Sequence, residues 1–132
     1  MKKTLEPRQL EELRTILKAR ARQLREEIRQ TLAKSDDEQY TMIADQVRDL
    51  EDDSFADLMV DVNLAEIDRD LQELRLIDAA FLHISDGTYG TCDACGSPIE
   101  IERLRATPFA SRCFDCQSAF ERNHVQNIGH TL

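Results

Sequence analysis

The chain has 132 residues, which is the length of one ordinary domain and too short for two large hydrophobic cores. Charged residues make up 33% and aromatic residues only 5%, so the apolar side chains are mostly aliphatic. This composition favours a mainly α-helical, elongated structure, in which only one stripe along each helix must be buried. No apolar run is long enough to span a membrane or to follow the basic start as a signal peptide, so we expect a cytoplasmic protein without membrane contact.

The net charge of −9 is distributed unevenly along the chain. Residues 8–34 carry a net charge of +4, residues 35–86 carry −13, and residues 88–122 carry −1. Such an acidic body repels the phosphates of nucleic acid, and a DNA-binding zinc module would carry a basic surplus. We therefore expect a protein partner and no direct binding to DNA.

Two segments have the apolar spacing of long helices. Residues 8–34 carry apolar side chains at steps of three and four, after Pro7, which suits a first helical turn: Leu10, Leu13, Leu17, Ala21, Leu24, Ile28 and Leu32. Residues 54–85 keep a 4-3 spacing with one polar break, and Gly87 follows as a stop: Val60, Leu64, Ile67, Leu71, Leu74, Asp78 and Phe81.

Pairing of the two helices satisfies both their apolar stripes and their opposite charges. We expect an antiparallel coiled-coil hairpin in a monomer, forming a first domain over residues 1–87. A parallel homodimer is the alternative, but it would place like charges beside each other. Residues 88–132 would form a second, small module with a terminal helix over residues 117–130.

The connection between the arms, residues 35–53, is long for a helix–helix turn. Ser35 and Glu38 predict a capping box, and an apolar face of Tyr40, Ile43 and Val47 indicates either a short extra helix or an extension of the first arm. Acidic residues then gather at the far end of the hairpin: Asp49, Glu51, Asp52 and Asp53. Clustered carboxylates are usually only solvated, but a rigid hairpin could carry them to a hard cation such as Mg²⁺ in another molecule.

The four cysteines give the strongest signal in the sequence. Cys92 and Cys95 form one Cys-x-x-Cys pair, and Cys113 and Cys116 form a second pair seventeen residues later. Two such pairs complete a tetrahedral shell of four thiolates without an open position, which predicts one structural Zn²⁺. Two disulfides or a redox-active dithiol are the alternatives. We expect the small core around the zinc to be supplied by Phe109, Phe114 and Phe120.

This combination of hairpin and zinc module resembles the DksA/TraR family of bacterial RNA polymerase regulators, over roughly residues 8–122. The segment TYGTCDACGSPIEIERLRATPFASRCFDC, residues 88–116, looks like the family's zinc signature. The family carries an Asp-x-x-Asp-x-Ala motif at its coiled-coil tip, which corresponds here to Asp49, Asp52 and Ser54. The resemblance implies a non-enzymatic regulator that binds RNA polymerase. Its tip would enter the secondary channel and alter the stability of open complexes.

Two departures from the family pattern concern its regulation. Ser54 adds a hydroxyl where the family has alanine at the tip. Members that respond to ppGpp place basic residues where this chain has Leu76, Thr107 and Gln117, so we predict weak or absent synergy with ppGpp. Arg103 and Arg105 lie nearby and could partly compensate.

Arg69 on the second arm has two interpretations. It either contacts the polymerase entrance or forms surface ion pairs with its acidic neighbours Asp68, Asp70 and Glu73.

Three other functions are compatible with these features. The chain could be a structural adaptor that docks onto an unrelated complex, a cysteine oxidoreductase, or a transcript-cleavage factor with an acidic coiled-coil tip. A metal-free, reactive thiol pair would distinguish the oxidoreductase, and loss of activity on replacing Asp49 and Asp52 would distinguish a regulator from an adaptor.

Overall fold

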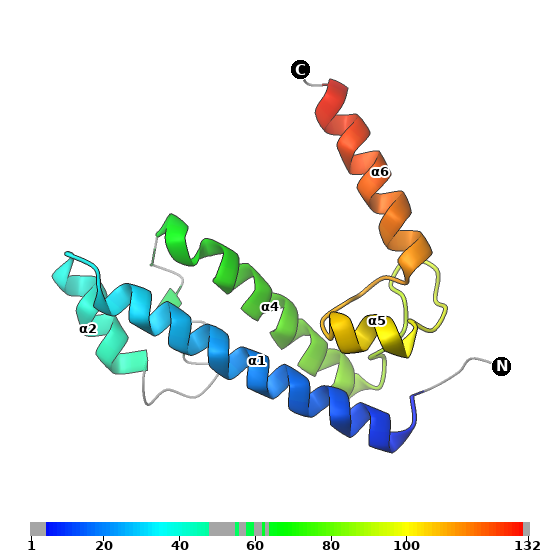
Figure 1. The fold of residues 1–132 in the computed structure, drawn as a ribbon, viewed down its shortest axis with the longest axis horizontal. Coiled ribbons are helices and arrows are strands. Elements are labelled where there is room, and N and C mark those ends of the chain that lie inside the picture. Colours follow the sequence, from blue (N-terminus) through cyan, green and yellow to red (C-terminus); the bar gives the residue numbers. More distant parts are fainter. Residues whose placement is uncertain (1–4, 48–54, 56–57, 60–61, 63, 131–132) are drawn as a thin grey trace. The chain divides into compact units, whose positions relative to one another are not determined.

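The structure is a computed structural model and describes residues 5–47, 55, 58–59, 62 and 64–130. Its helices include α1 (Pro7–Ala33), α2 (Glu38–Val47), α4 (Ala65–Asp86), α5 (Ile101–Ala106) and α6 (Phe114–His130) (Figure 1). The mainly α-helical fold class is thus confirmed. The chain forms two compact units: one comprises the residues up to Leu17 and those from Ile77 onward, and the other comprises Lys18–Leu76. The predicted division into domains at residue 87 stays a prediction.

Helix α1 forms as its apolar stripe predicts. It begins at Pro7, and the Gln9 side chain accepts a hydrogen bond from the backbone N–H of Glu6 at 3.0 Å, which satisfies one free donor at the helix start. At ~1.5 Å per residue the helix is about 40 Å long. Six of the seven predicted stripe residues are buried: Leu13, Leu17, Ala21, Leu24, Ile28 and Leu32.

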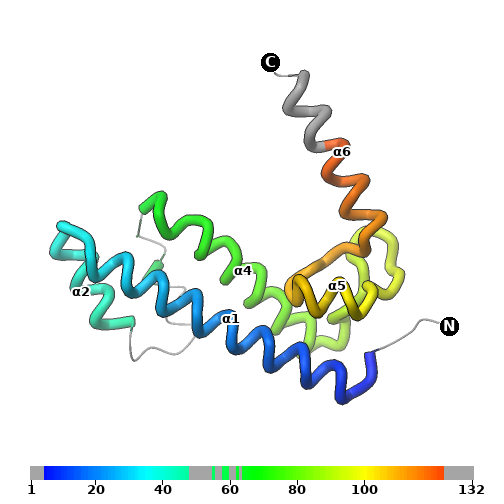
Figure 2. Tube along the Cα trace, viewed as in Figure 1, coloured from blue at the N-terminus to red at the C-terminus, as the bar shows by residue number. Residues whose placement is uncertain are grey.

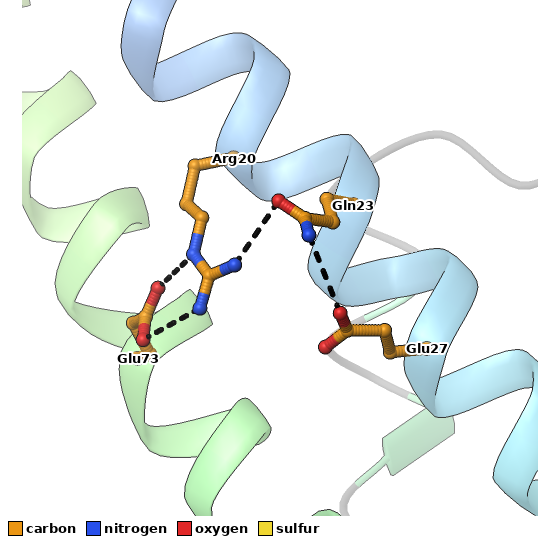
Figure 3. A network of polar contacts seen from close by, with 4 residues as sticks. All are labelled: Arg20, Gln23, Glu27 and Glu73. Atoms are coloured by element: carbon orange, nitrogen blue, oxygen red, sulfur yellow. Dashed lines mark hydrogen bonds and ion pairs between the residues drawn. The ribbon is translucent and has the colours of Figure 1, made fainter.

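In the unit formed by Lys18–Leu76, α1 and α4 run side by side in opposite directions (Figures 1 and 2). The Arg20 guanidinium donates two hydrogen bonds to the Glu73 carboxylate on α4, from Nε and, at 3.1 Å, from Nη2. A third bond runs from Arg20 Nη1 to Gln23 at 3.1 Å, and Gln23 donates in turn to Glu27 at 3.4 Å (Figure 3). The two-bonded pair of Arg20 and Glu73, called the fork below, fixes α1 and α4 in one register.

The predicted capping box at the start of α2 is wrong. The Asp37 carboxylate, rather than the Ser35 hydroxyl, caps the helix by accepting the backbone N–H of Gln39 at 2.9 Å. Ser35 Oγ instead accepts the N–H of Asp37 at 3.1 Å. The short extra helix itself is present, with one face buried: Ile43, Ala44 and Val47.

The second arm is interrupted where one continuous helix is predicted: Phe55, Leu58 and Met59 are helical, but α4 itself begins only at Ala65. Val62 and Leu64 lie outside any helix. Val62 and Ile67 are both buried, but five residues on one continuous helix would turn them about 140° apart. The break before α4 therefore lets both side chains reach the core.

The buried face of α4 also changes register after Leu74. The 4-3 spacing predicts that Asp78 and Phe81 are buried, but Ile77 and Ala80 take these places. Asp78 and Phe81 are half-buried. A step of three places the apolar Ile77 in the core in place of a carboxylate, which would be costly to bury.

Gly87 ends α4 as predicted. Its φ of +82° is in the left-handed region, and its N–H bonds to the Ile84 carbonyl at 3.4 Å. The N–H of Thr88 reaches back to the His83 carbonyl at 2.9 Å. These two bonds form a Schellman motif, which glycine adopts without a steric penalty.

Candidate metal centre

The first cysteine pair lies in a tight hairpin. Thr91 and Pro98 form an antiparallel bridge, and the N–H of Cys92 bonds to the Ser97 carbonyl at 2.8 Å. The N–H of Gly96 closes the turn onto the Cys92 carbonyl at 2.9 Å, with φ +76° at Gly96. Because the turn bends the chain back on itself, the two sulfurs of this pair face one point.

The second pair lies at the start of α6. The Cys113 carbonyl accepts the N–H of Gln117 at 2.9 Å, so Cys113 immediately precedes the helix and Cys116 lies in its first turn. A bond of 2.8 Å from the N–H of Asp93 to the Ser111 carbonyl joins the two pairs. The N-terminal end of α6 brings partial positive charge to this site, which favours thiolates.

The four sulfurs fit a tetrahedral zinc ion. All four Sγ atoms lie within 4.8 Å of one another, and the Sγ atoms of Cys95 and Cys113 are 3.9 Å apart. A tetrahedron with Zn–S bonds of ~2.3 Å has sulfur–sulfur edges of roughly 3.8 Å. All four cysteines are free thiols, so the predicted alternative of two disulfides is not observed.

Hydrogen bonds within the site shift the pKa values of the thiols in opposite directions. Burial opposes ionisation of Cys92, but backbone N–H groups, first among them that of Cys113, lower its pKa to about 6. The Ser97 hydroxyl and N–H lower the pKa of Cys95. Side-chain hydrogen bonds with Cys113 and Cys95 favour the protonated thiol of Cys116 and raise its pKa to about 12. A divalent cation removes this conflict, since it binds all four groups as thiolates.

The core beneath the cysteines differs from the predicted one. Phe114 and Phe120 are 63% and 46% exposed, and Phe109 is half-buried. The buried cluster consists instead of Leu13, Cys92, Ile99, Leu104 and Cys113. Helix α1 supplies Leu13, and Figure 2 shows the start of this helix beside the loops that follow α4. Nothing in the local sequence pattern identified Leu13 as part of the zinc module.

The N-terminal segment adds a further contact to this cluster. Leu5 packs against it, and a Cβ added at Gly90 would lie 3.0 Å from Leu5 Cδ1. Gly90 also has a φ of +86°, so glycine is required here for both space and conformation. The Tyr89 hydroxyl donates to the Pro108 carbonyl at 2.8 Å and holds the loop before α5 in place.

The predicted tip residues Asp49, Asp52 and Ser54 lie outside the described residues. Arg69 is exposed on α4 and forms no ion pair with any residue that the structure describes. Two of its three acidic neighbours have other partners: Glu73 binds Arg20, and Asp68 accepts a bond from Gln72 at 3.1 Å.

The two arginines that could compensate for missing basic residues are already engaged. Arg103 Nε donates to the Arg112 carbonyl at 2.8 Å, and Arg105 pairs with Glu12 at 3.3 Å. Gln117 accepts a bond from Arg112 and donates to Glu121 at 3.0 Å. Leu76 is 48% exposed.

None of the helices in the described part of the chain is both long and apolar enough to cross a membrane.

Comparisons with known proteins agree with this architecture. Residues 87–122 match the family described as the prokaryotic dksA/traR C4-type zinc finger, and accordingly the four cysteines bind one structural zinc ion. The RNA polymerase-binding transcription factor DksA of Escherichia coli K12 is 31% identical over 121 residues, which cover 92% of this chain and 77% of the relative. General stress protein 16O of Bacillus subtilis is 40% identical over 65 residues, or 49% of this chain and 39% of that protein.

Two solved structures are also similar. The DnaK suppressor protein of Agrobacterium tumefaciens C58 is 31% identical, with a TM-score of 0.58 over 89% of this chain and 96% of that one. The transcription factor DksA2 of Pseudomonas aeruginosa shares the fold, with a TM-score of 0.59, 22% identity and coverage of 90% and 88%. Because the similarity to the E. coli relative extends over nearly the whole chain, the chain belongs to the DksA/TraR family.

Proposed function

We propose that this chain binds bacterial RNA polymerase directly and regulates transcription initiation without catalysing a reaction. The observation that carries the proposal is the 31% identity to an RNA polymerase-binding transcription factor over 92% of the chain. The zinc centre and the paired helices α1 and α4 support it, because they provide the two structural parts of this family.

In this proposal the acidic tip acts at the catalytic centre of the polymerase. Asp49 and Asp52 are the carboxylates that would reach the metal environment there through the secondary channel, with Ser54 beside them. Carboxylate oxygens are the ligands that Mg²⁺ prefers, so their charge would change the stability of the open complex. Arg69 is the proposed contact at the channel entrance, which its exposed position supports.

Competition on core RNA polymerase tests the binding and the role of the tip. The purified chain should displace a labelled factor that occupies the secondary channel. Asp49→Asn with Asp52→Asn should displace it equally well but lose the effect on transcription. If the wild type does not displace the factor at micromolar concentration, the proposed function is wrong and the adaptor interpretation takes its place.

We further propose that ppGpp adds little to the activity of this protein. Leu76, Thr107 and Gln117 offer no cation to a phosphate group, and the bonds of Arg103 and Arg105 to other partners support the same conclusion. A ppGpp titration of promoter activity, with a ppGpp-responsive family member as the positive control, should leave the effect of this protein nearly unchanged. Strong enhancement would contradict the proposal.

A further inference from the structure

The cations of helix α1 within the Lys18–Leu76 unit fall into two groups. Arg20 faces α4 and is held by Glu73 in the fork shown in Figure 3. The others follow one another at steps of four, three and four residues, which places them on one helix face: Lys18, Arg22, Arg25 and Arg29. These four residues are called the basic stripe below. It rises ~17 Å along the helix axis at ~1.5 Å per residue.

The basic stripe is only partly neutralised within the chain. Lys18 and Arg22 are exposed and form no ion pair with any residue in the described segments. The Arg25 guanidinium lies 6.0 Å from the centre of the buried Phe55 ring, and Arg29 is bound to Glu26 at 2.5 and 2.9 Å. Two cations are therefore positioned by neighbours and two extend freely into solvent.

The size and surroundings of the stripe favour an acidic protein surface over nucleic acid. A duplex carries one negative charge per ~1.7 Å of its axis and continues far beyond the stripe. The segment 35–86, with its net charge of −13, also repels a duplex. An acidic helix with carboxylates three and four residues apart matches the spacing of the stripe.

We propose that the basic stripe is a second docking surface, which attracts an acidic helical face of the partner protein and speeds the encounter with it. The identity of that partner as RNA polymerase rests on the proposed function. Exposed ion pairs contribute little to affinity individually, so the stripe acts mainly on the association rate and on its dependence on salt.

Charge reversal with a matched control tests the proposal. Lys18→Glu with Arg22→Glu changes the stripe, whereas Arg8→Glu with Lys34→Glu changes the net charge equally at two exposed positions near the helix ends. Association with core RNA polymerase should slow about tenfold for the stripe variant at ~0.05 M salt, and the difference should vanish near ~0.5 M salt. The control should remain close to wild type. Equal slowing of both variants would overturn the proposal, because it would indicate a general charge effect.

A second measurement does not depend on the polymerase. A short poly-L-glutamate peptide is titrated into the isotope-labelled chain, and backbone amide NMR signals should shift at residues 18–29 in wild type but not in the stripe variant. Absence of these shifts, or tighter binding of a DNA duplex of equal charge at the same ionic strength, would overturn the inference. If wild type does not bind polymerase but shows the shifts, the proposed function fails and the acidic-partner surface stands.

Discussion

Replacing Leu13 with alanine tests whether helix α1 and the zinc centre share one core. Leu13 is fully buried among Cys92, Ile99, Leu104 and Cys113. A buried Leu→Ala change costs about 3 kcal/mol, because apolar contacts are lost and a cavity remains. Zinc is retained only while this small module is folded. The lower stability of the Leu13→Ala variant therefore raises the population of the open form that releases the metal. At 1.4 kcal/mol per tenfold, release should accelerate by up to about 100-fold.

The assay is the rate at which zinc-loaded protein transfers its metal to an excess of a chromogenic chelator. Leu24→Ala is the matched control, since Leu24 is equally buried on the same helix but belongs to the Lys18–Leu76 unit. It should lower the melting temperature and leave zinc release nearly unchanged. If Leu13→Ala releases zinc at the wild-type rate, or if Leu24→Ala accelerates release equally, the shared core is refuted.

Three further predictions concern polar contacts. In a double-mutant cycle with urea unfolding, Arg20→Met and Glu73→Gln should show a coupling of roughly 1 kcal/mol that shrinks with salt, because the pair is partly exposed; additive effects would contradict the fork. Asp37→Ala should cost about 1 kcal/mol of stability by removing the α2 cap, and an unchanged urea midpoint would contradict this. The hydrogen bond from the Thr88 hydroxyl lowers the pKa of Asp86 from its ordinary 3.8. The ionised Asp86 therefore stabilises the fold above pH 3.8, and this stabilisation is lost as the pH falls through the folded-state pKa. NMR titration of Thr88→Val should therefore show the Asp86 pKa rising towards 3.8; an unchanged pKa would contradict the assignment.

The features that the sequence predicts correctly depend on local spacing. The stripe from Leu13 to Leu32 needs only the helical period, and the zinc ligands need only two Cys-x-x-Cys turns. Gly87 is likewise a local signal, because a helix often ends at a residue with positive φ, which glycine adopts easily.

The features that the sequence pattern misses depend on which side chains are buried together in the core. The break before α4 lets Val62 and Ile67 be buried together, although one continuous helix would turn them about 140° apart; the 4-3 spacing alone does not reveal it. Phe114 is exposed, and the core beside the cysteines includes Leu13, about one hundred residues earlier in the chain.

The shared core explains how a chain with so few aromatic residues builds a stable module. The buried cluster around the cysteines holds five residues, two of which are zinc ligands, and none is aromatic. A core this small buries too little apolar surface to offset the loss of chain entropy by itself. Zinc binding supplies the missing free energy of folding. Because Leu13 packs in the same cluster, zinc binding also stabilises the start of α1. Metal retention and the order of the first turns of α1 should therefore be linked, so that loss of zinc loosens the N-terminal end of the helix as well as the loops that carry the cysteines.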